Sequence, residues 1–377
     1  MKKELQQKRL RSRAVATKQY AKRYAKAIRN KVTGEKQAKG HVKVDRFCLT
    51  DTELAFIQQE IEKGNKNFEK LIGFKTGELN NHSEVRVSLD TAKALIANSL
   101  PSTDITTLVT FILNHADFSV SQFIMNVNLS PEVFRDLAIL FRKVSKSTSF
   151  YLIARAKMIR PNGPIISNLF GSIADEYIAT LNVGIGVITY NRKDHLAKTV
   201  EAIKAFTTGD YQLVVADDGS KDDTVEWCQQ NNVPHTYCAN KGVVRNKNRA
   251  LYYLNEVKKV DVLILLEDDC RPNKESWQKE WVIAALLWGH INYAHKRIIK
   301  KEDAVVSGTG SSTLPYLCRL VTGQCTACSK DAMDNIGYLD PRFSGYGAGH
   351  VEWTERFIRQ GYNGSTVKHW VYPAINT

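Results

Sequence analysis

Three short apolar segments in the second half of the chain each end abruptly at a cluster of polar residues. They run from Val183 to Thr189, from Tyr211 to Ala216 and from Val262 to Leu266. None has a helical period, and apolar runs of this length are typical of strands buried on both faces. Helical segments alternate with them. This alternation predicts a mainly parallel sheet covered by helices, with ligands gathered at the carboxyl ends of the strands.

Each segment is followed by a turn whose side chains suit ligand binding. The turns are Thr189-Tyr190-Asn191-Arg192, Asp217-Asp218-Gly219-Ser220 and Glu267-Asp268-Asp269. Because parallel strands present their carboxyl ends at one edge, we expect these residues to lie close together. The acids of the last turn repel one another and lose hydration, so a cation should compensate them. A divalent metal carrying a phosphorylated ligand would do so, and a solvated acidic turn is the alternative for this motif alone.

Further motifs complete an ordered set. Residues 240–251 read Asn-Lys-Gly-Val-Val-Arg-Asn-Lys-Asn-Arg-Ala-Leu, and residues 336–343 and 345–356 combine glycine, aromatic and acidic residues. The set resembles the family 2 glycosyltransferases, which have the GT-A fold and transfer sugars from nucleotide donors. The resemblance spans about residues 182–370. It implies a GT-A domain at 179–377, with a Rossmann-like, mainly parallel sheet flanked by helices.

The resemblance also implies roles for single residues. Lys247 stands where the family usually has an arginine, and Arg245 would share its work on the diphosphate. Glu267 and Asp269 would bind Mn²⁺ or Mg²⁺ together with His369, for which a core position is the alternative. The expected nucleotide-sugar ligands are Thr189, Tyr190, Asn191, Arg192, Asp217, Asp218, Asn240, Gly242, Arg245, Lys247, Asn248 and Asp268.

The position of the catalytic base is the main departure from the family pattern. Gly349 and His350 stand where the family carries a Glu-Asp pair that normally includes the base. Inverting transfer needs a base for the acceptor hydroxyl and positive charge on the departing diphosphate. Histidine suits the first task near neutral pH, and so does a partly desolvated carboxylate. We therefore expect His350 or Glu352 to be the base, while the other binds acceptor or nucleotide.

The positive charge of the chain is concentrated at its start. Residues 1–46 hold 16 Lys and Arg against three acids, which accounts for 13 of the 14 net positive charges among 377 residues. The rest is nearly neutral, whereas a domain that reads nucleic acid is usually basic. We expect a basic arm at 1–40, helical or disordered, and a mostly helical region at 41–178. An anionic membrane surface or a nucleic-acid backbone would attract the arm.

Two further sequence features limit where such a protein works. No stretch approaches the ~20 apolar residues needed to cross a bilayer, and no apolar signal core follows Met1. The seven cysteines are scattered and suit reduced thiols. Cys325 and Cys328 are spaced like one of the two cysteine pairs of a zinc site, but no second pair accompanies them. Buried thiols are therefore expected there. These features predict a cytoplasmic protein, with peripheral association with the inner face of the membrane as an option.

Together these features predict a metal-dependent inverting glycosyltransferase. It would move a sugar from a nucleotide-sugar, with UDP-sugar as the expected donor, to a hydroxyl of a glycan or lipid-linked acceptor in surface polysaccharide synthesis. Two alternatives remain open. One is a transferase that acts on a modified nucleic-acid base, and the other is a degenerate protein that binds a nucleotide-sugar without transferring it.

Overall fold

The computed structural model describes residues 121, 124–125, 129–143, 145–343, 348–360, 362 and 371–375. The chain divides into two compact units, Met1–Ala116 and Asp117–Thr377, and every described residue belongs to the second. The predictions for the basic arm at 1–40, for the helical region up to residue 120 and for His369 therefore lie outside the described residues.

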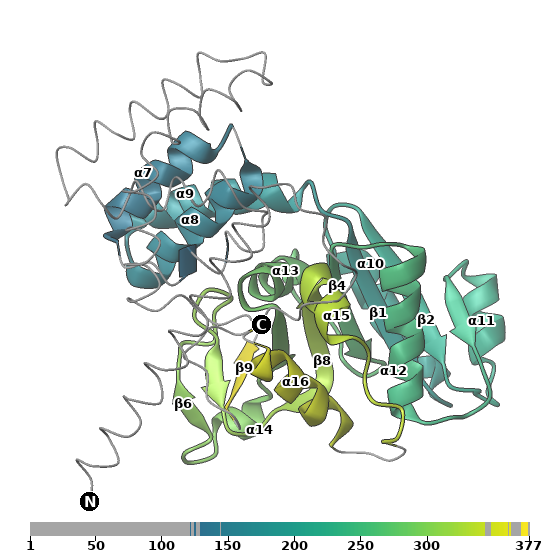
Figure 1. Cartoon of the computed structure of the whole chain (residues 1–377). Coiled ribbons are helices and arrows are strands. Elements are labelled where there is room, and N and C mark those ends of the chain that lie inside the picture. The colour runs from purple at the N-terminus through teal and green to yellow at the C-terminus, as the bar shows by residue number, and fades with distance from the viewer. Residues whose placement is uncertain are drawn as a thin grey trace, which may run out of the picture. The chain divides into compact units, whose positions relative to one another are not determined.

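Three helices precede the sheet: α7 (Pro131–Phe141), α8 (Lys146–Ile159) and α9 (Pro164–Ile178) (Figure 1). Ser130 caps α7, because its hydroxyl accepts a hydrogen bond from the backbone N–H of Val133 at 3.4 Å. Ile178, at the end of α9, packs against the core of the sheet domain. Residues 131–178 are thus mostly helical.

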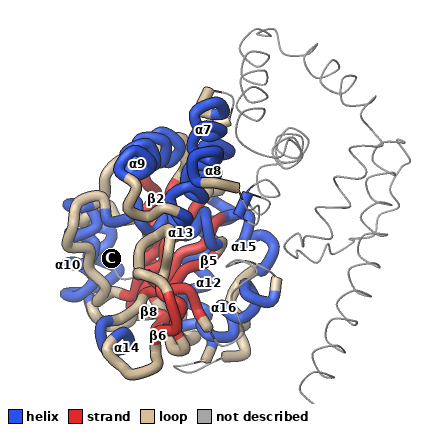
Figure 2. The backbone as a smooth tube through the Cα atoms, turned by 90° about the vertical axis from the view of Figure 1, so that its left-hand side faces the viewer, coloured by secondary structure: helices blue, strands red, loops and turns tan. Residues whose placement is uncertain are grey.

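The domain is built on one sheet of nine strands in the order β3-β2-β1-β4-β8-β5-β9-β7-β6 (Figure 2). The strands are β1 (Val183–Thr189), β2 (Tyr211–Asp217), β3 (His235–Tyr237), β4 (Val262–Glu267), β5 (His290–Tyr293), β6 (Val305–Ser307), β7 (Tyr316–Cys318), β8 (Thr322–Ser329) and β9 (Tyr372–Ile375). The first four strands run parallel, as predicted. β8 then enters antiparallel to both β4 and β5, so the α/β class is confirmed while the sheet as a whole is mixed.

Helices cover both faces of the sheet. They are α10 (Lys193–Phe206), α11 (Thr224–Gln230), α12 (Val243–Tyr252), its π-helical continuation η1 (Tyr253–Val257), α13 (Trp277–Trp288), α14 (Lys296–Ile299), α15 (Lys330–Ile336) and α16 (Gly349–Arg359). One core cluster joins the sheet to α10, α11 and α13, and the second joins it to α12, α15 and α16. Cys325 belongs to the first cluster and Cys328 to the second, so the two thiols are buried on opposite faces.

A close approach of α12 to the sheet depends on glycine. A Cβ atom at Gly186 of β1 would lie 3.1 Å from Cβ of Ala250 and 3.0 Å from the side chain of Leu265. The glycine thus lets α12 lie directly on β1, which fixes the height of α12 above the strand ends. Among the described residues, no helix is long and apolar enough to cross a membrane.

Candidate active site

The carboxyl ends of β1, β2 and β4 form one edge of the sheet. The register places Thr189 opposite Asp217, and Ile188 opposite Glu267. The three predicted polar turns therefore meet, and the predicted convergence is confirmed. We call this region, with the residues that contact it, the strand-end site.

The two aspartates at the end of β2, Asp217 and Asp218, bond to different parts of the strand-end site. Asp217 accepts hydrogen bonds from the backbone N–H of Ser220 at 3.1 and 3.3 Å and from its hydroxyl. Asp218 accepts from the backbone N–H groups of Lys241 at 3.1 Å and Gly242 at 2.8 Å. Burial raises the pKa of Asp217, and its bonds with Ser220 oppose that effect. Asp218 thus fixes the start of α12 to the end of β2.

Two residues of α12 that received no predicted role connect the strand ends. The Asn246 amide donates to the backbone oxygens of Thr189 at 3.2 Å and Ala216 at 2.8 Å. Arg249 donates to the Asp218 carboxylate at 3.1 Å and to the side-chain oxygen of Asn246 at 2.7 Å. Both residues lie inside the Asn-rich motif at 240–251. Asn246 is 2% exposed and Arg249 is half-buried, and both are neighbours in sequence of the predicted ligands Lys247 and Asn248.

Two cationic side chains pair with the acidic turn at the end of β4. Arg192 contacts Asp268 at 2.9 Å and Asp269 at 3.1 Å, and Lys247 contacts Glu267 at 3.2 Å. Asp268 is 3% exposed and also accepts from the Thr189 hydroxyl at 2.8 Å. Burial raises the pKa of Asp268, while Thr189 and Arg192 lower it. The chain itself thus offsets two of the three negative charges of this turn, and one is left for a bound cation.

A divalent cation fits this turn by the chemistry of its donors. Asp269 and Glu267 offer carboxylate oxygens, which hard cations such as Mg²⁺ and Mn²⁺ prefer, and their side chains are 37% and 31% exposed. Within the described ranges, no three His, Cys, Asp or Glu side chains are grouped so as to hold a metal ion. Diphosphate oxygens and water would therefore have to complete the coordination that these two carboxylates begin.

His350 lies beside Lys247 at the strand-end site. A Cβ atom built on Gly323 would lie 3.0 Å from Cγ of His350 and 3.1 Å from Nζ of Lys247. Lys247 donates to the backbone oxygen of Gly323 at 2.7 Å, and the His350 ring lies 3.4 Å from the backbone oxygen of Val321. Because residue 323 is a glycine, the Lys247 amine and the His350 ring can both approach this part of β8.

A buried histidine of β5, His290, contacts the side of α16 that faces the sheet. The ring of His290 on β5 stacks on Phe357 with centroids 4.4 Å apart, and its Nε2 lies 3.0 Å from the Thr354 hydroxyl. Thr354 also donates to the backbone oxygen of His350 at 2.9 Å. Burial lowers the pKa of His290 to about 3, so this imidazole is neutral at physiological pH. The first turn of α16, which carries His350, is therefore linked to β5 through Thr354 and His290.

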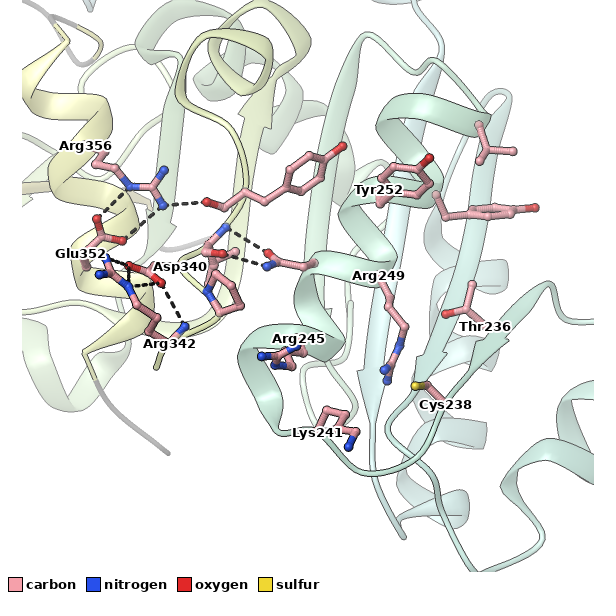
Figure 3. A pocket seen from close by; sticks show the side chains of 16 residues that line it. Thr236, Cys238, Lys241, Arg245, Arg249, Tyr252, Asp340, Arg342, Glu352 and Arg356 are labelled. Atoms are coloured by element: carbon pink, nitrogen blue, oxygen red, sulfur yellow. Dashed lines mark hydrogen bonds and ion pairs between the residues drawn. The ribbon is translucent and has the colours of Figure 1, made fainter. Parts of the chain in front are cut away.

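Glu352 points away from His350, into a second cavity. Its carboxylate pairs with Arg356 at 2.8 and 3.2 Å, and Arg356 also donates to the backbone oxygens of Ile336 and Tyr338. We call this space of about 1080 Å³ the outer cavity. Figure 3 shows Glu352, Arg356, Asp340 and Arg342 along one wall, and Lys241, Arg245 and Tyr252 along the other. The structure thus separates the two candidate bases.

The remaining predicted donor residues are divided between several environments. Asn191 accepts from the backbone N–H of Lys221 at 2.7 Å, and Asn248 exchanges hydrogen bonds of 2.8 and 3.0 Å with the backbone of Leu339. Tyr190 is 40% exposed, and Asn240 is also exposed. Arg245 lies in the outer cavity, on the opposite face of α12 from Lys247. These roles in donor binding remain predictions.

A smaller cavity of about 470 Å³ adjoins Asp269. Its wall includes Gln324 of β8, Tyr293, His295 and the indole rings of Trp277 and Trp281. Both tryptophans are nearly buried, at 7% and 2% exposed, and belong to the core. A pocket of this size beside a candidate metal ligand is suited to a sugar-sized group.

Comparisons with known proteins agree with the predicted family. Residues 185–284 match the family described as "Glycosyl transferase family 2". No curated protein matches the chain.

Three solved structures show weaker likenesses. GalNAc-T7 with UDP, GalNAc and Mn²⁺ is 15% identical with a TM-score of 0.36, and the match covers 47% of this chain and 40% of that one. S. aureus TarS 1-349 is 12% identical with a TM-score of 0.36, and the match covers 52% of this chain and 60% of that one. The mannosyltransferase PcManGT from Pyrobaculum calidifontis, in complex with GDP-Man and Mn²⁺, is 14% identical with a TM-score of 0.39. The match covers 65% of this chain and 66% of that one.

This chain spans less than two thirds of each of these three proteins. Identities below 25% and TM-scores below 0.5 transfer neither substrate nor metal to it. The family match, by contrast, runs from β1 into α13 and includes all three turns of the strand-end site. Residues 185–284 therefore belong to glycosyl transferase family 2.

Proposed function

We propose that the protein is a metal-dependent inverting glycosyltransferase that moves a sugar from a nucleotide-sugar, such as a UDP-sugar, to an acceptor hydroxyl. One arrangement carries the proposal. Lys247 and the His350 ring both approach Gly323, and Lys247 pairs with Glu267 of the acidic turn that ends at Asp269. A cation, a carboxylate pair and a proton acceptor are the groups that sugar transfer requires within one site.

Donor binding is proposed for the part of the strand-end site between β1, β2 and α12. Asp217 and Asp218 lie where the nucleoside would bind, and Lys247 would contact the diphosphate as the sugar leaves. Mn²⁺ or Mg²⁺ bound by Asp269 and Glu267 would neutralise the diphosphate. Arg192 pairs with the acidic turn and is 41% exposed on its side chain, so it is able to turn toward a bound phosphate.

His350 is proposed as the general base. Its ring lies next to Lys247, whereas Glu352 is engaged by Arg356 at the outer cavity. The neutral imidazole would take the proton from the acceptor hydroxyl as the hydroxyl oxygen attacks the anomeric carbon. The sugar would enter the cavity beside Asp269, where Gln324 and Tyr293 offer polar atoms.

The proposed acceptor is a glycan or lipid-linked saccharide used in surface polysaccharide synthesis. The basic arm at 1–40 motivates a peripheral position on anionic lipid, and this part of the proposal rests on sequence alone. Flotation of the full chain with liposomes of phosphatidylglycerol, compared with a chain lacking residues 1–40, tests it. Equal flotation of the two chains would contradict a membrane role for the arm.

The activity is tested by release of nucleoside diphosphate from a panel of UDP- and GDP-sugars with Mn²⁺, Mg²⁺ or chelator. We expect His350→Ala to lower kcat by about 100-fold or more while the KM for the donor changes little. Glu352→Gln should keep most of the rate. Equal loss in both variants would contradict the assignment of the base, and tight UDP binding without any transfer would favour the degenerate binding protein.

A further inference from the structure

The outer cavity lies on the opposite side of α12 from the strand-end site. Helical spacing places Arg245, Asn248 and Tyr252 on one face of α12, whereas Lys247, Ala250 and Leu254 face the sheet. A ligand in the outer cavity would therefore not contact the buried amine of Lys247. Its volume of about 1080 Å³ is at the upper end of typical small-ligand sites, which hold roughly 300–1000 Å³.

Positive charge at one end of the cavity is left uncompensated. Five Lys and Arg side chains line the cavity against Asp340 and Glu352. Arg249, Arg342 and Arg356 each pair with a carboxylate. The side chains of Lys241 and Arg245 are exposed, and neither has a hydrogen bond or ion pair with another described residue. These two neighbouring cations form a place for one anionic group.

The other end of the cavity presents exposed rings. Tyr252 is 56% exposed, and its ring centroid lies 6.2 Å from that of Tyr338 on the opposite wall. Tyr338 is fixed by its hydroxyl, which donates to Glu256 at 3.0 Å. The π-helical turn η1 places Tyr253 and Val257 in the same wall. Such turns are rare in proteins as a whole, and those that occur are often found at functional sites. An aromatic surface of this kind suits the apolar face of a sugar ring.

We propose that the outer cavity binds a phosphorylated saccharide, with its phosphate at Lys241 and Arg245 and a sugar ring against Tyr252. A nucleic acid fits less well, because it carries a charge at every nucleotide and needs a longer row of free cations. The proposal places Arg245 in a site separate from donor binding, in place of the role on the diphosphate predicted for it, and does not require the proposed transfer reaction. A free sugar phosphate and a phosphorylated glycan chain share the recognised chemistry.

Calorimetric titration of the full chain tests the proposal. The probes are glucose 6-phosphate, a 6-phosphorylated maltotriose, and the same two sugars without phosphate. We expect the phosphorylated probes to bind at least about tenfold more tightly than the uncharged ones, because charge-assisted hydrogen bonds to phosphate are lost otherwise. Tighter binding of the trisaccharide would identify a glycan chain as the ligand, and equal binding a free sugar phosphate.

Variants then locate the binding. The double variant Lys241→Ala/Tyr252→Ala, and separately Arg245→Ala, should each weaken the phosphorylated probes about tenfold or more. The matched control is Lys204→Ala, an exposed lysine on α10, which should leave their affinity unchanged.

Competition separates the two sites. The double variant should bind UDP as the native chain does, and UDP should not displace the sugar phosphate. Unchanged affinity in both outer-cavity variants, displacement by UDP, or tighter binding of an eight-nucleotide oligothymidine would each overturn the proposal. A chain that binds sugar phosphate but no UDP would contradict the proposed function alone.

Discussion

The two sides of α12 differ in how their charges are held. On the sheet side, Lys247 pairs with Glu267 and Arg192 pairs with Asp268, and of these Lys247 and Asp268 are buried. On the other side, Lys241 and Arg245 are exposed at the mouth of a cavity. The motif at 240–251 supplies Lys247 to the first side and Lys241 and Arg245 to the second, and the helical period directs Lys247 and Arg245 to opposite faces of α12. A pre-bonded site holds its groups for chemistry, whereas exposed cations are suited to bind a ligand that arrives with its own charge.

The largest difference between the two sides should follow from loss of a carboxylate. Asp269→Asn removes a proposed metal ligand, so we expect metal-dependent transfer to fall about a thousandfold or more, because metal stabilisation of the leaving group is worth several kcal/mol. The measurement is kcat/KM with saturating Mn²⁺. The matched control is Asp340→Asn in the outer cavity, which should stay close to the native rate. A near-native rate for Asp269→Asn would remove this residue from the metal site.

A pair of lysines gives the next comparison. Lys247→Met removes the buried cation beside Glu267, and we expect transfer to fall about 100- to 1000-fold, as for loss of one preorganised charge. Lys241→Met changes the same side chain on the outer wall and should leave the donor kinetics unchanged. Rates are compared after circular dichroism shows that both variants are folded. Similar losses in both would mean that the two sides of α12 are one site.

The third prediction concerns the contribution of Asn246 to the stability of the domain. Asn246→Ala leaves the buried backbone oxygen of Ala216 without the amide that bonds it at 2.8 Å. We expect the free energy of unfolding to fall by about 1–3 kcal/mol, the usual cost of a buried group left unsatisfied. Chemical denaturation measures this change. The control Asn231→Ala alters an exposed residue at the end of α11 and should cost less; an equal cost would show that the strand ends do not depend on Asn246.

The smallest effect concerns Arg192. Arg192→Gln removes a cation that competes with a metal for Asp269. We expect Mn²⁺ affinity in the absence of donor to rise about fivefold, because a partly exposed ion pair is worth about 1 kcal/mol or less. Titration followed by electron paramagnetic resonance measures it, with Lys193→Gln as the control. Weaker Mn²⁺ binding in Arg192→Gln would show that Arg192 supports the metal site and does not oppose it.

The part of the fold that local pattern determines was predictable. The predicted strand Val183–Thr189 has the bounds of β1, and helices occupy most of residues 131–178, before that strand. The meeting of Thr189 with Asp217 follows from parallel pairing alone. The second half was not predictable in this way, because β8 lies between β4 and β5 through pairings that no local period encodes.

Side-chain direction was the other limit. His350 and Glu352 were treated as equal candidates because residues 349–359 had not been assigned to a helix. In α16, residues two apart point to different faces, which directs Glu352 to Arg356 and the outer cavity. The pairing of Arg192 with Asp268 and Asp269 joins two loops, and its geometry depends on backbone details of both.

The pairing of the acidic turn with two cations has a consequence for the protein in the cell. Arg192 and Lys247 offset two of the three charges on Asp268, Asp269 and Glu267, so one negative charge of the turn is left for an ion to offset. Newly made chains would therefore depend only weakly on manganese or magnesium in order to fold. Under the proposed mechanism, scarcity of these ions would stop transfer by existing molecules without removing them, and replenishment would restore transfer without new synthesis.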